Sequence, residues 1–124
     1  MNTEAFKLAY GMSRNGTDVF FKNPLFPQFH YSDGVQQCAE AGVYWLLDVV
    51  ATEFLKPLRR SGEVMGILEV VVAADKATIE MTISDDGPPV HRKKIVHTDM
   101  PDGKWLFYLA DEGERFALIL PTEY

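Results

Sequence analysis

Residues 33–55 read D-G-V-Q-Q-C-A-E-A-G-V-Y-W-L-L-D-V-V-A-T-E-F-L, and this stretch decides the fold. Its apolar residues recur close to the period of an α-helix, about 3.6 residues per turn. From Ala41 to Ala51 the only charged residue is Asp48. A helix that is apolar nearly all round is expected to be buried, with other elements packed around it. The expected core-facing positions are Val35, Ala39, Gly42, Leu46, Val49 or Val50, and Phe54.

The ends and the middle of this helix carry further signals. Ser32 offers a side-chain oxygen as N-cap, and Asp33 places a negative charge at the positive end of the helix. Pro57 is expected to end the helix, with the chain leaving through residues 59–62. Gly42 lowers the helix propensity by about 1 kcal/mol, so either another backbone approaches closely there or two helices meet at a bend.

The segments before this helix are shorter. Residues 3–12 suit a short helix, with Thr3 as its N-cap and Gly11 as its stop signal. Residues 18–21 are expected to form a short strand. Residues 23–31 read N-P-L-F-P-Q-F-H-Y, in which the prolines break regular structure and the aromatic side chains predict an ordered loop held on the core.

The second half of the chain is typical of β-strands. Residues 64–73 are apolar on both faces, which predicts a central strand, and residues 77–84 alternate as in a strand with one face on the core. Three further strands are expected at 90–98, 104–110 and 115–120. The turns between them are too short for parallel crossovers. The sequence therefore predicts one α+β domain, residues 1–124, with an antiparallel meander of about five strands, the main helix on one face and a short N-terminal helix.

The composition is that of a soluble globular domain. The chain has 124 residues, of which 47% are hydrophobic, enough for one core. Its single cysteine, Cys38, has no partner for an internal disulfide, and no apolar run reaches the roughly 18 residues of a membrane span. Residues 1–4 lack the features of a signal peptide. We therefore expect a cytoplasmic protein that does not bind a membrane.

The net charge of −6 comes from the second half of the chain. Residues 1–62 hold six basic and six acidic residues, whereas residues 63–124 hold six basic and twelve acidic ones. An acidic surface repels DNA and RNA and attracts proteins rich in Lys and Arg. The candidate interaction patch consists of the acidic residues at two turns, Asp85, Asp86, Asp111, Glu112 and Glu114. The alternative is that these residues only keep the turns soluble.

A polar stripe on the main helix is the second candidate site. Its members are spaced three or four residues apart: Gln37, Glu40, Tyr44, Asp48 and Thr52. Tyr44 and Asp48 lie one turn apart, close enough for a hydrogen bond between their side chains. A carboxylate among apolar neighbours needs a hydrogen-bond partner. Asp48 is therefore either the anchor of a small pocket, for a ligand or for acid–base chemistry, or an acceptor for buried N–H groups of the loop at 23–31.

Five motifs of the chain resemble a known family. They are N-P-L-F at 23–26, Y-S-D-G-V at 31–35, A-E-A-G-V-Y-W-L-L-D at 39–48, Y-L-A-D at 108–111 and L-P-T-E-Y at 120–124. The family consists of small, uncharacterised bacterial proteins associated with plasmids, integrative elements and prophages, often called plasmid-related proteins. The resemblance covers roughly residues 16–124 and implies a small α+β domain in a mobile-element setting. It implies no activity and no catalytic residues.

The sequence lacks the common motifs of catalysis, metal binding and nucleotide binding. It contains no G-x-S-x-G, G-x-G-x-x-G or P-loop motif. Cys38 lies in the apolar helix and is expected to be a core residue. His91 and His97 on one expected strand would lie about 20 Å apart, too far to share a metal ion. Residues 92–94, Arg-Lys-Lys, are expected to protect an edge strand rather than to bind nucleic acid. No cofactor and no metal are expected.

Three classes of function follow from these observations. The first, which we favour, is a non-catalytic interaction protein of a mobile element or phage, for which inhibition of a host protein such as a nucleic-acid-processing defence complex is one role. The second is a small-molecule-binding module with a pocket near Tyr44 and Asp48. The third is an enzyme that uses Asp48 and a histidine. The expected partner is a protein with a basic surface and not a nucleic acid, and self-association stays open.

Overall fold

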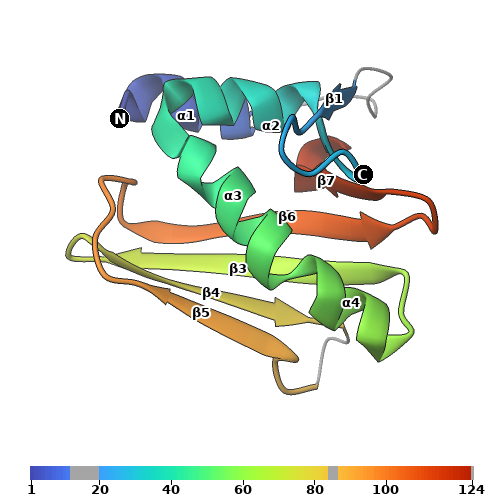
Figure 1. The fold of residues 1–124 in the computed structure, drawn as a ribbon. Coiled ribbons are helices and arrows are strands. Elements are labelled where there is room, and N and C mark those ends of the chain that lie inside the picture. Colours follow the sequence, from blue (N-terminus) through green and yellow to red (C-terminus); the bar gives the residue numbers. More distant parts are fainter. Residues whose placement is uncertain (12–19, 84–86, 124) are drawn as a thin grey trace.

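A seven-stranded sheet, covered by helices on one face, forms the centre of the computed structural model (Figure 1), which describes residues 1–11, 20–83 and 87–123. The helices are α1 (Thr3–Gly11), α2 (Asp33–Cys38), the π-helical turn η1 (Ala39–Val43), α3 (Tyr44–Glu53) and α4 (Leu55–Ser61). The strands are β1 (Phe20–Lys22), β2 (Phe29–Ser32), β3 (Met65–Ala73), β4 (Lys76–Thr82), β5 (His91–Ile95), β6 (Gly103–Asp111) and β7 (Phe116–Ile119), followed by the 3-10 turn η2 (Pro121–Glu123).

The α+β class is confirmed, whereas the predicted five-stranded meander is wrong. The strand order is β1-β2-β7-β6-β3-β4-β5, with β2 parallel to β7 and the other neighbouring pairs antiparallel. After β5 the chain passes along the end of the sheet and pairs β6 with β3 instead of β5 (Figure 1). A short connection suffices because β5 ends and β6 begins at the same end of the sheet, where the Thr98 N–H donates to the Asp75 carbonyl at 2.7 Å.

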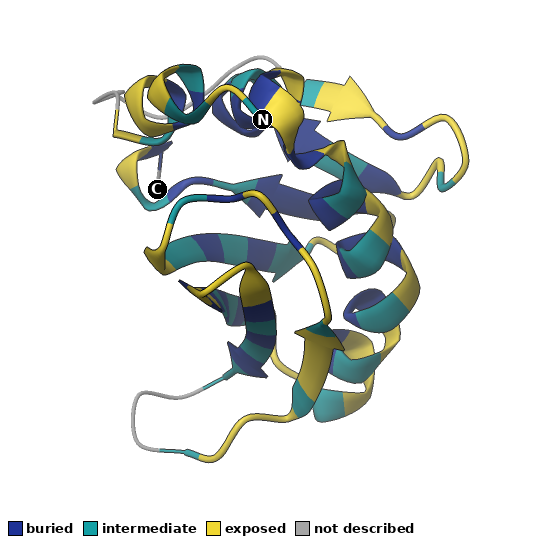
Figure 2. Ribbon diagram, turned by 90° about the vertical axis from the view of Figure 1, so that its left-hand side faces the viewer, coloured by how far each residue is buried: buried dark blue, intermediate teal, exposed yellow. Residues whose placement is uncertain are grey.

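The core lies between the helices and one face of the sheet (Figure 2). The expected alternation along β4 is confirmed, since Ala77, Ile79 and Met81 are buried and the residues between them are not. The main helical stretch, by contrast, is not buried all round, because no layer covers its outer side. Tyr44 on that side is 49% exposed. The buried helical residues that face the sheet are Val35, Cys38, Ala39, Leu46, Leu47, Val50 and Phe54.

Both explanations offered for Gly42 hold. Gly42 has a φ of 131°, a value that favours glycine, and here the helix bends into the π-helical turn η1. Another backbone also approaches closely, because a Cβ at Gly42 would lie 2.9 Å from the Cα of Met1. The Asn2 N–H donates to the Ala41 carbonyl at 2.7 Å. The bend therefore fixes the direction of α3 relative to α2.

The predicted end of the helix at Pro57 is wrong. The helix breaks at Phe54, and Pro57 lies in the first turn of α4. A proline is tolerated there because its missing N–H has no helical acceptor in a first turn. The α4 helix instead ends at Gly62, which has a left-handed φ of 78°. This extra turn and a half places Arg59 and Arg60 on a helix and not in an exit loop.

The segments before the main helix agree only in part with expectation. The α1 helix is confirmed, but its cap is Asn2 and not Thr3, because the Ala5 N–H donates to Asn2 Oδ1 at 3.0 Å. The β1 strand begins at Phe20; residues 18 and 19 of the expected strand lie outside the described residues. The expected loop at 23–31 is cut short, because β2 starts at Phe29 and pairs with β7. The Ser32 cap is confirmed, since its Oγ accepts the Val35 N–H.

Candidate functional site

The Tyr44 and Asp48 side chains do not form a hydrogen bond with each other. The Tyr44 hydroxyl accepts a hydrogen bond from Gln36 Nε2 at 3.1 Å. Asp48 is exposed, and its carboxylate forms no hydrogen bond with any residue that the structure describes. Its backbone carbonyl accepts a hydrogen bond from Thr52 Oγ1 at 2.8 Å. The structural role expected of Asp48 belongs to the buried Asn23, whose Oδ1 accepts the N–H groups of Leu25 at 2.9 Å and Phe26 at 3.0 Å.

The predicted polar stripe is divided among three depressions, and the third, described below, is lined by Thr52 alone of the five residues. Gln37 and Glu40 face a depression between α1 and α2, where Gln37 Nε2 donates to Asp33 and Gln36 Nε2 donates to Glu40. Tyr44 and Asp48 line a different one, of about 260 Å³, which Leu25 in the loop after β1 also lines. The bend at Gly42 separates the two, because it ends the regular helical spacing on which the stripe was based. A volume of 260 Å³ also falls below the roughly 300–1,000 Å³ of ordinary ligand pockets.

Ion pairs occupy much of the predicted acidic patch. Arg59 binds Asp111 through two nitrogens, at 2.9 and 3.1 Å, and this hydrogen bonding lowers the pKa of the Asp111 carboxyl. Arg115 Nε pairs with Glu112 at 2.7 Å. Glu114 is exposed, whereas Asp85 and Asp86 lie outside the described residues. The described part of the patch is thus a surface of mixed charge.

A groove that the sequence interpretation missed, similar in volume to the depression of about 590 Å³ between α1 and α2, lies between α4, the loop after β1 and the start of β7. Its volume is about 600 Å³. A further depression of about 280 Å³ beside it shares Phe26, Gln28 and Leu55 and adds Leu25, which is 78% exposed. We call this surface the α4 groove and define it by six lining residues, Phe26, Leu55, Lys56, Arg59, Arg60 and Phe116.

The α4 groove combines an apolar floor with a basic rim. The guanidinium of Arg59 stacks over the Phe116 ring at 4.5 Å from its centroid, and it donates to the Gly113 carbonyl at 2.8 Å. Arg59 is therefore held in place from three sides, with Asp111 as its counter-ion. Lys56 and Arg60 are exposed and form no ion pair with any residue that the structure describes.

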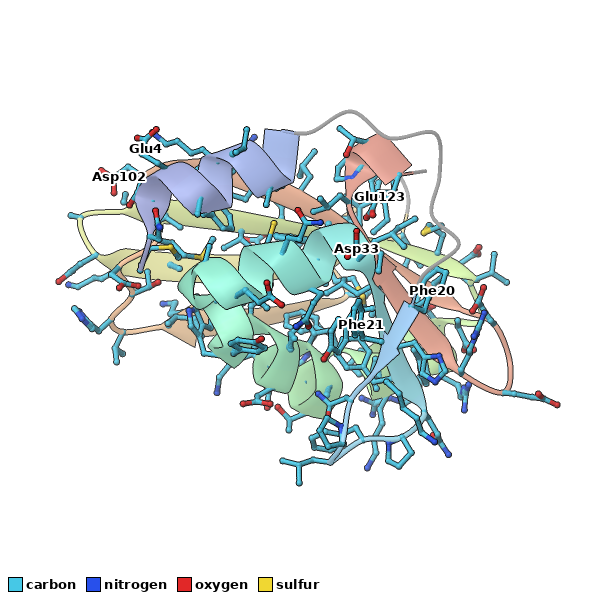
Figure 3. The ribbon with its side chains drawn as sticks, turned by 90° about the horizontal axis from the view of Figure 1, so that it is seen from above. Glu4, Phe20, Phe21, Asp33, Asp102 and Glu123 are labelled. Atoms are coloured by element: carbon cyan, nitrogen blue, oxygen red, sulfur yellow. The ribbon has the colours of Figure 1, made fainter. Side chains whose placement is uncertain are left out.

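Two of the motifs noted in the sequence meet at a buried carboxylate. Glu123 is 4% exposed and lies on η2 beside the start of α2, near Asp33 (Figure 3). Its Oε1 accepts the Ser32 hydroxyl at 2.5 Å and the Leu120 N–H at 2.9 Å, and its Oε2 accepts the Gly34 N–H at 3.2 Å. This contact links the Y-S-D-G-V and L-P-T-E-Y segments. All its groups have partners within the chain, so its role is to hold the fold.

His91, His97 and Cys38 are not among the residues that line the α4 groove, and neither is His30, although it lies on β2 opposite Ala117, next to the groove residue Phe116. Cys38 is fully buried, as expected. His91 Nε2 lies 3.3 Å from Glu53 Oε1 at the end of α3, and His97 Nδ1 lies 3.4 Å from Asp75 Oδ2 at the β3–β4 hairpin. In residues 1–11, 20–83 and 87–123, no group of three or more His, Cys, Asp or Glu side chains is arranged to hold a metal ion. The same residues contain no helix with the length and apolar character needed to cross a membrane.

Comparison with known proteins supports the fold and a family. The fold is similar to the crystal structure of a protein of unknown function from Enterococcus faecalis, with a TM-score of 0.50 and 13% identity over 78% of this chain and 90% of that one. At this identity the similarity concerns the fold alone. No curated protein matches the chain. The model of the Family of unknown function (DUF6876) matches residues 12–124, and the chain therefore belongs to that family.

Proposed function

We propose that this protein is a non-catalytic binding protein that recognises a segment of another protein through the α4 groove. The observation that carries the proposal is the apolar floor formed by Phe26, Leu55 and Phe116, with the strongly exposed Leu25 beside it. Large apolar side chains left in water next to an apolar groove are typical of protein interaction sites. The stacked Arg59 adds the residue type that, with aromatic residues, is enriched at the centres of interfaces.

The shape of the groove favours a protein segment over a small molecule. One wall is a helix and the other is formed by residues 25–28, and the depression beside Leu25 extends the groove along the surface, which gives the room that several side chains of a bound segment need. The alternative is a small-molecule pocket at Tyr44 and Asp48. That depression has a smaller volume than the α4 groove, and its Asp48 side chain is exposed to water. We therefore prefer binding of a protein.

The biological setting of the proposal comes from the family resemblance. It implies a bacterial mobile element, and we propose that the protein acts in the cytoplasm on a host or element protein, with inhibition of a nucleic-acid-processing complex as one role. A partner with a basic surface remains a separate prediction for the exposed carboxylates, supported by the net charge of −6. The ion pairs of Asp111 and Glu112 weaken that prediction at the β6–β7 turn.

A matched pair of surface variants tests the proposal. Leu25→Asp removes the exposed apolar side chain beside the groove, and Leu8→Asp makes the same change on α1, where Leu8 is 69% exposed. Both positions are in water, so both variants should keep the melting temperature of the wild type. Tagged wild-type protein, expressed in its bacterial host, should retain a partner that Leu8→Asp also retains and Leu25→Asp loses by about tenfold or more. Equal retention by both variants would place the binding surface elsewhere.

A further inference from the structure

We propose that the segment bound in the α4 groove is acidic as well as apolar. One apolar side chain enters between Phe26, Leu55 and Phe116, and the neighbouring carboxylates of the segment face Lys56 and Arg60. This inference rests on the proposed function and specifies the chemistry of the partner.

The charges on the rim carry the inference. Lys56 and Arg60 lie one helical turn apart, line the same groove and form no ion pair with any described residue. The neighbouring Arg59 differs, because Asp111 already neutralises it. The rim therefore presents two uncompensated positive charges beside an apolar floor. A bound carboxylate would gain charge-assisted hydrogen bonds there, whereas a basic segment would meet two like charges.

The position of Arg59 makes the groove a prepared site. Its guanidinium is held over Phe116 by bonds to Asp111 and to the Gly113 carbonyl, so it is ordered before a partner arrives. An ordered wall loses less side-chain entropy on binding than a mobile one. The stacked pair of Arg59 and Phe116 thus offers a rigid side for the apolar anchor, while Lys56 and Arg60 stay free to reach a carboxylate.

The acidic net charge of the protein does not oppose this assignment. At physiological ionic strength charges are screened beyond about 8 Å, so carboxylates elsewhere on the surface act weakly at the groove. Nucleic acid is a poorer occupant, because binding to a phosphate backbone draws on many basic contacts and the rim offers only Lys56 and Arg60 beyond the paired Arg59. The combination of an apolar floor with a short basic rim fits an acidic peptide segment.

Selection from a library of random phage-displayed peptides tests the inference on the full chain. The wild type should enrich peptides in which Asp or Glu flanks a Leu, Phe or Trp. The Lys56→Glu/Arg60→Glu variant reverses the rim charge and should enrich Lys or Arg in those flanking positions. The control, Lys93→Glu/Lys94→Glu, makes the same change in net charge on the exposed β5 strand and should select the same peptides as the wild type.

Fluorescence anisotropy with one selected peptide gives the size of the effect. Its dissociation constant should rise about tenfold or more in Lys56→Glu/Arg60→Glu and in Leu25→Asp, and should change little in the β5 control. Added salt should raise the dissociation constant of this peptide more for the wild type than for Lys56→Glu/Arg60→Glu, because only the wild-type rim attracts the carboxylates of the peptide. Thermal melts of each variant confirm that the fold is kept.

The outcomes separate this inference from the proposed function. Peptides that depend on Leu25 but show no preference for acidic residues would overturn the inference and leave binding at the surface around Leu25, which lies between the α4 groove and the Tyr44–Asp48 depression. Peptides that depend on neither Leu25 nor the rim, or no enrichment at all, would contradict both. Tight binding of a labelled single-stranded oligonucleotide that is lost in Lys56→Glu/Arg60→Glu would also overturn the inference, since the rim would then serve phosphates.

Discussion

Glu123 shows at the scale of a single residue how distant segments are joined. Its buried carboxylate accepts hydrogen bonds from Ser32, Gly34 and Leu120. A glycine is needed at position 34, because a Cβ there would lie 2.7 Å from Glu123 Oε2. The positive end of α2 thus receives its negative charge both from Asp33 and from a residue about ninety positions away.

Removal of this carboxylate should destabilise the fold. Glu123→Ala leaves buried N–H and O–H donors without an acceptor, at a cost of about 1–3 kcal/mol for such unpaired groups. Glu123→Gln keeps the shape and one acceptor oxygen and should lose less. Urea titration followed by the fluorescence of Trp45 and Trp105 measures both free energies of unfolding. An alanine variant as stable as the wild type would show that the carboxylate does not hold the two segments together.

The Arg59–Asp111 pair makes a prediction about pH. Arg59 lowers the pKa of Asp111 in the folded state, so the stability from this pair is present above the unfolded pKa, about 3.9, and is lost as the pH falls through the folded pKa. Asp111→Asn should therefore be less stable than the wild type at pH 7, and the difference should shrink below about pH 4. Melting temperatures measured from pH 7 to strongly acidic pH check this; a constant difference would argue against the assigned cause.

At the scale of the helices, Gly42 determines where the groove forms. The bend in η1 turns α3 and α4 away from the direction of α2 and across the sheet (Figure 1). A straight helix would carry Lys56 and Arg60 to a different place, and the groove beside Phe116 would be lost. The conformation of one glycine is therefore a condition for the proposed site.

Gly42→Ala should destabilise the protein by about 1–3 kcal/mol, because an L side chain at a φ of 131° is strained and its Cβ would crowd Met1. The matched control is Gly11→Ala, at the end of α1, where a Cβ would have no neighbour within 4 Å. That variant should be unchanged or more stable by up to about 1 kcal/mol. Chemical denaturation compares the two. Equal effects would mean that the backbone at Gly42 relaxes without cost.

The sequence predicts the elements better than their arrangement. The alternation of residues 77–83 and the apolar run at 64–73 are local signals, and β4 and β3 form where these signals occur. The pairing of β2 with β7 joins residues 29–31 to 116–118, and no local pattern reports a contact over such a distance. The break at Phe54 was missed for a similar reason, since Pro57 suits the first turn of a helix as well as its end.

The candidate site was the least predictable part. The polar stripe was drawn on a straight helix, and the bend at Gly42 divides it. The α4 groove is formed by the loop at 23–28, α4 and the start of β7. In the sequence these segments are typical of a loop, a helix and a strand, and none of them by itself indicates a binding site. Only the sheet order brings Phe116 next to α4. The sequence shows two basic residues at 59 and 60, but it does not show that Arg59 pairs with Asp111 while Arg60 is exposed without an ion pair to any described residue.

At the scale of the whole molecule, charge predicts what the protein does not bind. The net charge is −6, and the exposed basic residues of β5 form a short edge-strand run, as expected from residues 92–94. We expect no tight binding of DNA or RNA at physiological salt, because few phosphates would be neutralised. A gel-shift titration with single- and double-stranded oligonucleotides checks this. A retarded band at submicromolar protein would contradict it.

The most direct test of the account maps the partner onto the surface. Hydrogen–deuterium exchange is measured for the protein alone and with the partner, or with a peptide selected on the wild type, bound at saturation. The account predicts slower exchange in peptides that cover residues 23–28 and 51–60, around Leu25, Leu55 and Lys56, and unchanged exchange in α1 and β5. Protection confined to α1 or to the β5 edge, with residues 51–60 unaffected, would contradict the claim that the α4 groove is the binding site.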